Sequence, residues 1–175
     1  GQKGIVYEIR ECISAIGASG RFIAVMEKEM SNYLREIPYS PFILSIKGIG
    51  VITAAGLIGE VGDFRNFKTI PEIMKHAGLE LFEISSGRHK GRKRISKRGR
   101  SLLRKLLFFA SINTVRKGGV MHDYYQRYLH RGAPKIKALI AVSRKLLGII
   151  FALVRNNSVY IEDYSRVKYQ LKEAA

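Results

Sequence analysis

The amino-acid sequence predicts a mainly α-helical protein. We expect a long N-terminal helix of the coiled-coil type, then a helical domain with a helix-hairpin-helix motif and room for a short β-hairpin. Three observations predict this fold: apolar residues recur at helical spacing over the first 37 residues, two glycines separate short apolar segments near residue 50, and segment 134–154 is almost wholly apolar. The domains expected are 1–38 (dimerisation helix), 39–160 (folded domain) and 161–175 (polar tail).

Charge is spread unevenly along the chain. The net charge is +17, yet residues 1–36 hold five basic and five acidic residues. Between Glu83 and Asp123 there are twelve Lys or Arg residues and no carboxylate. Like charge at this density repels itself unless a polyanion lies against it, and nucleic-acid phosphate is the obvious candidate. An N-terminal segment without net charge, joined to a strongly basic remainder, therefore indicates that the two parts have different functions.

Composition excludes several classes of protein. The single cysteine, Cys12, rules out a disulfide framework and a cysteine-rich zinc site, and a reducing cytosol is the expected compartment. The His, Asp and Glu residues form no ligand pattern, so we expect no metal or other cofactor on this chain. No apolar run reaches the roughly 18 residues of a membrane span, so no membrane partner is expected. Because the chain starts at Gly1 with no Met or leader pattern, we interpret it as part of a longer protein.

A long amphipathic helix is predicted from about Ile5 to Ile37. Its stripe follows alternating steps of four and three, as in a coiled-coil seam, and only Ser19 interrupts it. The stripe consists of Ile5, Ile9, Cys12, Ile16, Ser19, Ile23, Met26, Met30, Tyr33 and Ile37. Pro38 and Pro41 then end the helix. We expect a homodimer or higher oligomer through this helix; the alternative is that the stripe packs on its own domain.

Residues 42–64 have the form of a helix-hairpin-helix motif. The hairpin is Gly48-Ile-Gly, and a second helix continues through Thr53 and Leu57. The glycines let the backbone turn tightly and present bare N–H groups at a helix N-terminus, where a phosphate is favoured. Ile49 between them is expected to point inward as an anchor. The alternative is a plain helical hairpin that binds nothing.

The rest of the domain is predicted as helices around one short hairpin. Residues 69–78 form a helix with Thr69 as N-cap, Pro71 in the first turn and Gly78 as C-cap. Segments 79–84 and 92–95 can pair as strands. Further helices are expected at 101–116, 122–130 and 134–154, the last as the buried spine, opened by Pro134. In 101–116 the expected apolar stripe is Leu102, Leu103, Leu106, Phe109, Ala110 and Asn113.

Two serines, Ser85 and Ser86, begin the basic run and precede Gly87. A serine hydroxyl attacks phosphorus only if its proton is removed and the developing charge is neutralised. The basic neighbours supply charge, and His89 is the nearby group whose ordinary pKa suits a base. Serines beside glycine also serve as plain turn residues, so spacing alone leaves the nucleophile open. The predicted nucleic-acid contacts are Lys47, Gly48, Gly50, Thr53, Arg88, Lys90, Arg92, Lys93, Arg94, Lys97, Arg98, Arg100 and Arg104.

An ordered series of motifs over residues 40–160 resembles the C-terminal domain of the DEDD-type insertion-sequence transposases, a group with Piv-type DNA invertases and RNA-guided bridge recombinases. The motifs are Ile46-Lys-Gly-Ile-Gly-x-x-Thr-Ala, Gly62-Asp-Phe-Arg-x-Phe, Ala77-Gly-Leu, Ser85-Ser-Gly, Ile95-Ser-Lys-Arg-Gly-x-x-x-Leu-Arg, Tyr128 with Gly132, and Ala141 with Arg144-Lys-Leu-Leu. The chain departs from the family at Lys47, where proline is usual; this change adds charge and should keep the hairpin.

The resemblance implies a mechanism. A RuvC-like N-terminal domain with four carboxylates would bind Mg²⁺, a coiled-coil arm would link it to this domain, and a serine would attack DNA and form a covalent phosphoserine. The family serine directly precedes the glycine, which selects Ser86, with Ser85 as the alternative. DNA, and a structured guide RNA, would be partners of a nucleoid-associated bacterial protein. Without the carboxylate domain, this part alone should not cut DNA.

The function predicted is therefore that of the C-terminal DNA-binding and catalytic-serine domain of a transposase or site-specific recombinase, which moves an insertion sequence by strand cleavage and exchange. The rival is a non-catalytic module that binds DNA or RNA. A third interpretation is an inert remnant of a decayed element. Both of the first two predict salt-sensitive binding; only the enzyme needs Ser86.

Overall fold

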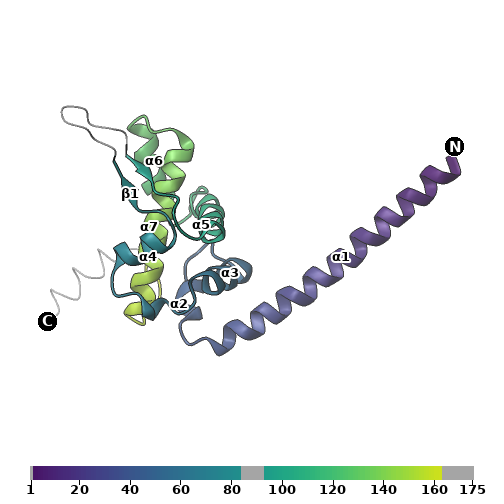
Figure 1. Ribbon diagram of the computed structural model, residues 1–175, viewed down its shortest axis with the longest axis horizontal. Helices are drawn as coiled ribbons and strands as arrows, with labels where there is room; N and C mark the ends of the chain where they lie inside the picture. Colours follow the sequence, from purple (N-terminus) through teal and green to yellow (C-terminus); the bar gives the residue numbers. More distant parts are fainter. Residues whose placement is uncertain (1, 84–92, 163–175) are drawn as a thin grey trace. The chain divides into compact units, whose positions relative to one another are not determined.

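The computed structural model describes residues 2–83 and 93–162 of the chain. It divides the chain into two units, residues 1–38 and residues 39–175. The described part is mainly α-helical with one two-stranded sheet, which confirms the predicted fold class (Figure 1). Among the described helices, none combines the length and apolar character that a membrane crossing requires.

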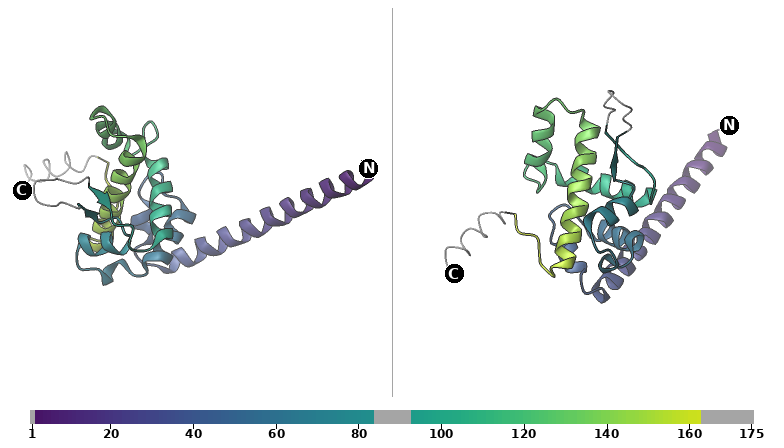
Figure 2. Two further views of the ribbon diagram at one scale, coloured as in Figure 1. Left: turned by 45° about the horizontal axis from the view of Figure 1, so that its top comes forward. Right: turned by 60° about the vertical axis from the view of Figure 1, so that its left-hand side comes forward.

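The second unit is built around α7 (Lys135–Arg155), which confirms the predicted buried spine (Figure 2). Its side chains Val142, Leu146, Leu147 and Ile150 are completely buried. The helices α5 (Ser101–Thr114) and α6 (His122–His130) pack against it, together with α2 (Ser40–Leu44) and α4 (Ile70–His76). A helix that is apolar on most faces must be covered by several neighbours. Pro134 is the N-cap of α7 and not part of its first turn.

The buried face of α5 differs from the expected stripe. The side chains of Leu102 and Phe109 are about half exposed, at 49% and 50%, and Asn113 is exposed as well. The residues that α5 buries are Leu103, Leu107, Ala110, Ser111 and Thr114. Hydroxyls can take these buried positions because each bonds locally: Ser111 Oγ donates to the Leu107 carbonyl at 2.7 Å, and Thr114 Oγ1 donates to the Ser111 carbonyl at 3.1 Å.

A hydroxyl pair joins α5 to α7 in the core. Ser111 Oγ lies 2.9 Å from Ser143 Oγ, and Ser143 Oγ also bonds the Leu139 carbonyl at 2.9 Å. Both serines are buried. The buried hydroxyls are thus satisfied without water, which is why polar residues can lie on the packed faces of both helices.

Two close glycines join the end of α4 to the start of α5. Thr69 is the N-cap of α4, as predicted, and Gly78 follows the C-cap residue Ala77 in a left-handed conformation, φ +65°. Two backbone bonds, Gly78 N to Lys75 O at 2.9 Å and Leu79 N to Met74 O at 2.8 Å, close the helix in a Schellman motif. Gly99 lies against this turn, where an added Cβ would be 2.4 Å from the His76 carbonyl oxygen. The segment that leads into α5 is therefore held on α4 by backbone contacts that tolerate no side chain.

The predicted hairpin is present as a short antiparallel pair, β1 (Leu81–Phe82) and β2 (Arg94–Ile95). Leu81 pairs with Ile95, and Phe82 pairs with Arg94. A further bond from Ser96 N to Glu80 O, 2.8 Å, continues the pairing toward α4. The expected strands 79–84 and 92–95 are longer than those observed, and Ile84 and Arg92 lie outside the described residues.

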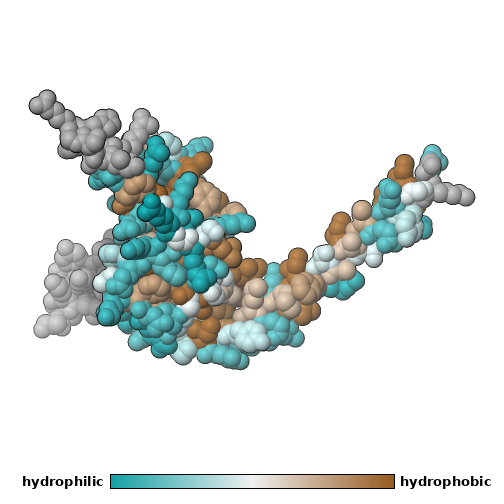
Figure 3. Space-filling view, in the orientation of Figure 1, coloured by the Kyte–Doolittle hydropathy of each residue, from teal (hydrophilic) through white to brown (hydrophobic). Residues whose placement is uncertain are grey.

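The first unit is one helix, α1 (Gln2–Glu36), close to the expected bounds. Apolar residues of its predicted stripe are exposed along the helix, as the brown patches on it show (Figure 3). Ile5, Ile16 and Ile23 expose between 56% and 72% of their surface. A lone helix gains most of its stability from packing of its apolar face, so this stripe is suited to a partner helix. That such a partner is a second copy stays a prediction.

Candidate nucleic-acid interface

The glycine hairpin lies between α2 and α3 (Val51–Val61), as the sequence predicts. Gly48 adopts φ +101°, a conformation that L side chains rarely reach, and an added Cβ would lie 3.1 Å from Thr114 Cγ2. Ile49 is buried, which confirms it as the inward anchor, and its N–H donates to the Ile46 carbonyl at 2.9 Å. The turn is therefore fixed from inside by Ile49 and pressed against the end of α5 at Gly48.

The N-terminus of α3 is open. Its N-cap, Gly50, offers no side-chain acceptor, and the first turn contains no acidic residue. The first intrahelical bond at this end runs from Ala54 N to Gly50 O, 2.9 Å, so the N–H groups of residues 51–53 have no partner within the helix. Unsatisfied N–H groups and the positive end of the helix dipole together favour an anion here.

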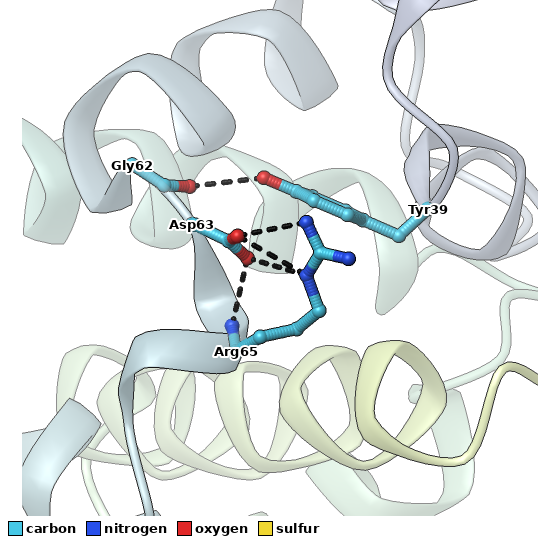
Figure 4. Close-up of polar contacts among 4 residues, drawn as sticks. All are labelled: Tyr39, Gly62, Asp63 and Arg65. Carbon is cyan, nitrogen blue, oxygen red and sulfur yellow. Dashed lines mark hydrogen bonds and ion pairs between the residues drawn. The ribbon is translucent and has the colours of Figure 1, made fainter.

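The other end of α3 is fixed by the Gly62-Asp-Phe-Arg motif (Figure 4). Asp63 accepts a bond from Arg65 N at 2.9 Å and caps the short 3-10 helix η1 (Phe64–Asn66), while its carboxylate pairs with the Arg65 guanidinium at 2.8 Å. Bonding to Arg65 holds the pKa of Asp63 below its usual value. Tyr39 Oη donates to the Gly62 carbonyl at 3.1 Å, with the Arg65 guanidinium over its ring. This motif thus positions α3 and leaves its N-terminus free.

Cations gather beside the open end of α3. Lys47 Nζ approaches the Gly118 carbonyl at 3.5 Å, so the loop after α5 lies next to the hairpin. Two exposed basic residues, Arg116 and Lys117, precede Gly118 in this loop. Both residues belong to the basic run of the sequence but were not among the predicted contacts. The signal that would have selected them is a second pair of glycines, Gly118-Gly119, directly after two basic residues.

A second basic group lies at the base of the hairpin strands. Lys93, Arg94, Lys97, Arg98 and Arg100 are all exposed. Two of them meet carboxylates, Lys93 at 4.0 Å from Glu83 and Arg100 at 3.6 Å from Glu60. Exposed pairs at these distances contribute little stability, so an incoming phosphate can replace the carboxylate. This group precedes α5, whereas Gly48 contacts its last residue, Thr114; at 1.5 Å per residue the two groups lie roughly 20 Å apart.

Arg104 has partners inside the protein. Its Nη1 donates to the Ala77 carbonyl at 3.0 Å and to the carbonyls of Gly99 and Arg100 at 3.3 and 3.4 Å. The side chain is half-buried and links the end of α4 to the start of α5. These bonds give Arg104 a structural role, which explains why an arginine occurs at this position of the Ile95–Arg104 motif. Its contact with a phosphate stays a prediction.

Several of the predicted site residues lie outside the described residues. They are Ser85, Ser86, Arg88, Lys90 and Arg92, together with the candidate base His89. Thr53 is described and is half-buried in the first turn of α3. The structure therefore brings together Lys47, Gly48, Gly50 and Thr53, and separately the basic residues at positions 93–100.

Within residues 2–83 and 93–162, no three His, Cys, Asp or Glu side chains are close enough together to hold a metal ion. The resemblance implies Mg²⁺ for the carboxylates of a separate domain, not for the described residues.

Known proteins are similar in sequence to the unit that carries these residues. Residues 40–126 match the family model of the IS116/IS110/IS902 transposases. The chain is 29% identical over 135 residues to an insertion-element IS110 protein of 43.6 kDa from Streptomyces coelicolor, covering 77% of this chain and 33% of that protein. It is 31% identical over 133 residues to a pilin gene-inverting protein of Moraxella lacunata, covering 74% and 41%.

A probable family 20 transposase of Pseudomonas aeruginosa is 28% identical over 141 residues, which cover 79% of this chain and 42% of that protein. The chain thus spans between 33% and 42% of the length of these three relatives. The ordered motifs, the family match and these relatives agree, and the chain belongs to the IS116/IS110/IS902 family of transposases.

Proposed function

We propose that this chain is the DNA-binding and catalytic-serine domain of an insertion-sequence transposase that cleaves and exchanges DNA strands. One observation carries the DNA-binding part: the open N-terminus of α3, with no acidic residue in its first turn, lies beside Lys47 and a basic loop. Contacts of this kind grip the phosphate backbone without reading bases. Sequence choice would then come from elsewhere, and a guide RNA is the source that the family resemblance implies.

The two basic groups suit one duplex. They lie roughly 20 Å apart along α5, which is about six base pairs at 3.4 Å per step. One duplex lying along α5 would therefore contact both the hairpin with its neighbouring loop and the base of the strands. The segment that contains Ser86 connects the two strands in sequence and lies outside the described residues.

In the proposed reaction the Ser86 hydroxyl attacks a DNA phosphorus. The new Oγ–P bond forms as a P–O bond of the strand breaks, the serine proton passes to a base such as His89, and the departing strand oxygen takes up a proton. Arg and Lys residues of the basic run offset the phosphate charge. Ser85 is the alternative nucleophile. The implied Mg²⁺ would be held by carboxylates of a RuvC-like domain outside this chain, and α1 would join copies of the protein.

The binding proposal is tested with the chain and a labelled 30-base-pair duplex, by fluorescence anisotropy between roughly 50 and 200 mM salt. If six or more phosphates are engaged, affinity should fall about a thousandfold over this range. Binding that is weak and insensitive to salt would overturn the proposal. An RNA duplex of the same length shows whether the basic groups prefer one nucleic acid.

The serine proposal is tested in a transposase that carries this chain, with Ser86→Ala and Ser85→Ala as a matched pair. Ser86→Ala should lower strand exchange by several orders of magnitude at unchanged DNA affinity, and Ser85→Ala should exchange strands like the parent. A phosphoserine–DNA adduct trapped from the parent should be absent from Ser86→Ala. Exchange by Ser86→Ala would refute the nucleophile and leave a domain that only binds nucleic acid.

A further inference from the structure

Arg144, in the middle of α7, has a buried donor atom that no described residue meets with a hydrogen bond. Its Nε atom is buried without a hydrogen bond, and no described residue forms an ion pair with its guanidinium. Arginine is always charged, and a buried charged donor is costly unless an acceptor meets it. The side chain as a whole is only half-buried, so its outer part can be reached from solvent.

Tyr124 of α6 is within the electrostatic reach of this arginine, and Tyr128 contacts Tyr124. Tyr124 and Tyr128 are one helical turn apart, with hydroxyl oxygens 3.4 Å and ring centroids 5.3 Å from each other. The charge of Arg144 acts on Tyr124, and α6 packs directly on α7. We call Tyr124, Tyr128 and Arg144 the tyrosine–arginine seam.

The seam has surplus donors. Burial, and then the bond to Tyr128, raise the pKa of Tyr124 to about 12, against the opposing effect of Arg144 and Arg127, so this phenol keeps its proton at neutral pH. Two hydroxyls that share one hydrogen bond leave one O–H proton for a further acceptor. The guanidinium adds several N–H donors. Within the described residues no carboxylate is paired with either group.

The matching ligand is an oxyanion. A guanidinium fork and a phenol O–H suit the tetrahedral oxygens of a phosphate, which accepts several hydrogen bonds at once. Arg127, whose guanidinium lies 5.5 Å from the Tyr124 ring centroid, adds positive charge at the rim. The carboxylates of the described ion pairs belong to residues 60, 63 and 83, none of which is on α6 or α7.

Figure 1 places α6, which carries the two tyrosines, and the strand β1 toward the end of α7 at which α7 begins. We propose that the tyrosine–arginine seam binds a phosphate of the DNA backbone, as a contact beyond the glycine hairpin and the base of the strands. This inference rests on the proposed function, because it assumes that DNA lies on this unit.

The test is the salt dependence of duplex binding by Arg144→Gln, compared with the parent chain and with Lys47→Gln. Loss of one phosphate contact lowers the slope of log affinity against log salt by about 0.9. Arg144→Gln should show this change with affinity about fivefold weaker near 100 mM salt. The double variant should lower the slope by about twice as much, because the two contacts are far apart.

Two further variants separate binding from folding. Tyr128→Phe keeps the ring and removes one hydroxyl, and it should weaken DNA binding about twofold with an unchanged melting temperature. Arg144→Lys keeps the charge without the fork and should restore most of the salt slope but not the full affinity. An unchanged slope and affinity in Arg144→Gln, beside a lowered slope in Lys47→Gln, overturns the seam alone. A parent chain without salt-sensitive binding overturns the proposed function instead. Loss confined to an RNA duplex overturns the assignment to DNA.

Discussion

The N-termini of two helices in the second unit, α4 and α3, differ in whether an acidic residue lies in the first turn. At α4, Glu72 in the first turn reaches back and accepts a bond from Lys68 N at 2.8 Å. This bond lowers the pKa of Glu72, and it places a carboxylate of the protein itself in the first turn of this helix. At α3, the N-cap Gly50 has no side chain that could accept a hydrogen bond, and the first turn contains no acidic residue.

This difference indicates which helix start is available to a ligand. The positive end of a helix dipole favours an anion, and α4 supplies one there from its own sequence, the carboxylate of Glu72. The start of α3 instead has Lys47 and the loop of Arg116 and Lys117 nearby. These residues add positive charge beside the free N–H groups, so an anion from outside the protein is favoured there. The α5 helix also begins without an acidic residue, directly after Arg98 and Arg100. Open helix starts and basic residues therefore occur together in this unit.

The largest effect is expected from Gly48→Ala, which removes the turn that exposes the start of α3. The substitution forces a side chain into φ +101° and toward Thr114 Cγ2, so we expect a loss of about 2 kcal/mol in unfolding free energy. Urea unfolding measures it. Gly50→Ala is the matched control, because Gly50 has φ −94° and no atom within 4 Å of an added Cβ. It should cost only about 0.5 kcal/mol. Equal losses would mean that the hairpin is not held by its left-handed glycine.

Gly50→Asp should convert the start of α3 into one like that of α4. The new carboxylate can accept the free N–H groups, which should raise the unfolding free energy by a few tenths of a kcal/mol, roughly. DNA affinity should fall at least about tenfold, because the carboxylate occupies and repels the phosphate position. Gly50→Asn, an uncharged cap of the same shape, is the control and should bind better than Gly50→Asp. If the two variants bind DNA equally well, the start of α3 is not a phosphate site.

Lys47→Gln should remove one cation from beside the open helix start. We expect the salt slope of DNA binding to fall by about 0.9, with affinity lower by a factor of about five. Lys105→Gln makes the same charge change on the exposed side of α5, outside the predicted contacts, and serves as the control. Equal changes in both variants would indicate a general charge effect rather than a contact at the hairpin.

The smallest effect is expected from Glu72→Gln at α4. The pKa of Glu72 is lowered in the folded state, so its stabilising contribution is present above its ordinary pKa and is lost as the pH falls through that range. The melting temperature of Glu72→Gln should therefore lie slightly below that of the parent near pH 7, and the difference should disappear once the pH is below the lowered pKa of Glu72. DNA affinity should not change. A deficit that persists at low pH would show that the carboxylate charge is not the cause.

Local patterns in the sequence were sufficient to predict where the helices and the hairpin lie along the chain. The bounds of α6 match the predicted segment 122–130, and the other helices agree to within a few residues. These elements follow from local rules, because proline, glycine and apolar spacing act over a few neighbouring residues. The glycine hairpin was recognisable for the same reason, because the positive φ of its turn requires a glycine at one position in a short segment.

The tertiary structure was needed to show which face of each helix is buried and which side chains bond one another. The buried face of α5 is set by Ser111, whose partner Ser143 is 32 positions away, so an apolar pattern alone selects Phe109 wrongly. Arg104 was grouped with the phosphate contacts, yet its guanidinium bonds the Ala77 carbonyl. The loop of Arg116 and Lys117 joins the interface only because Lys47 meets Gly118, 71 positions away in sequence.

The sequence by itself determined the family, the helical order and the basic character of the second unit, because motif order, spacing and charge are properties of the chain. Only the tertiary structure decided, for the described residues, which basic side chains are exposed, which helix start has no acidic residue, and which arginine buries a donor atom without a hydrogen bond. Those properties depend on hydrogen bonds between residues far apart in sequence, and such bonds exist only once the helices have packed.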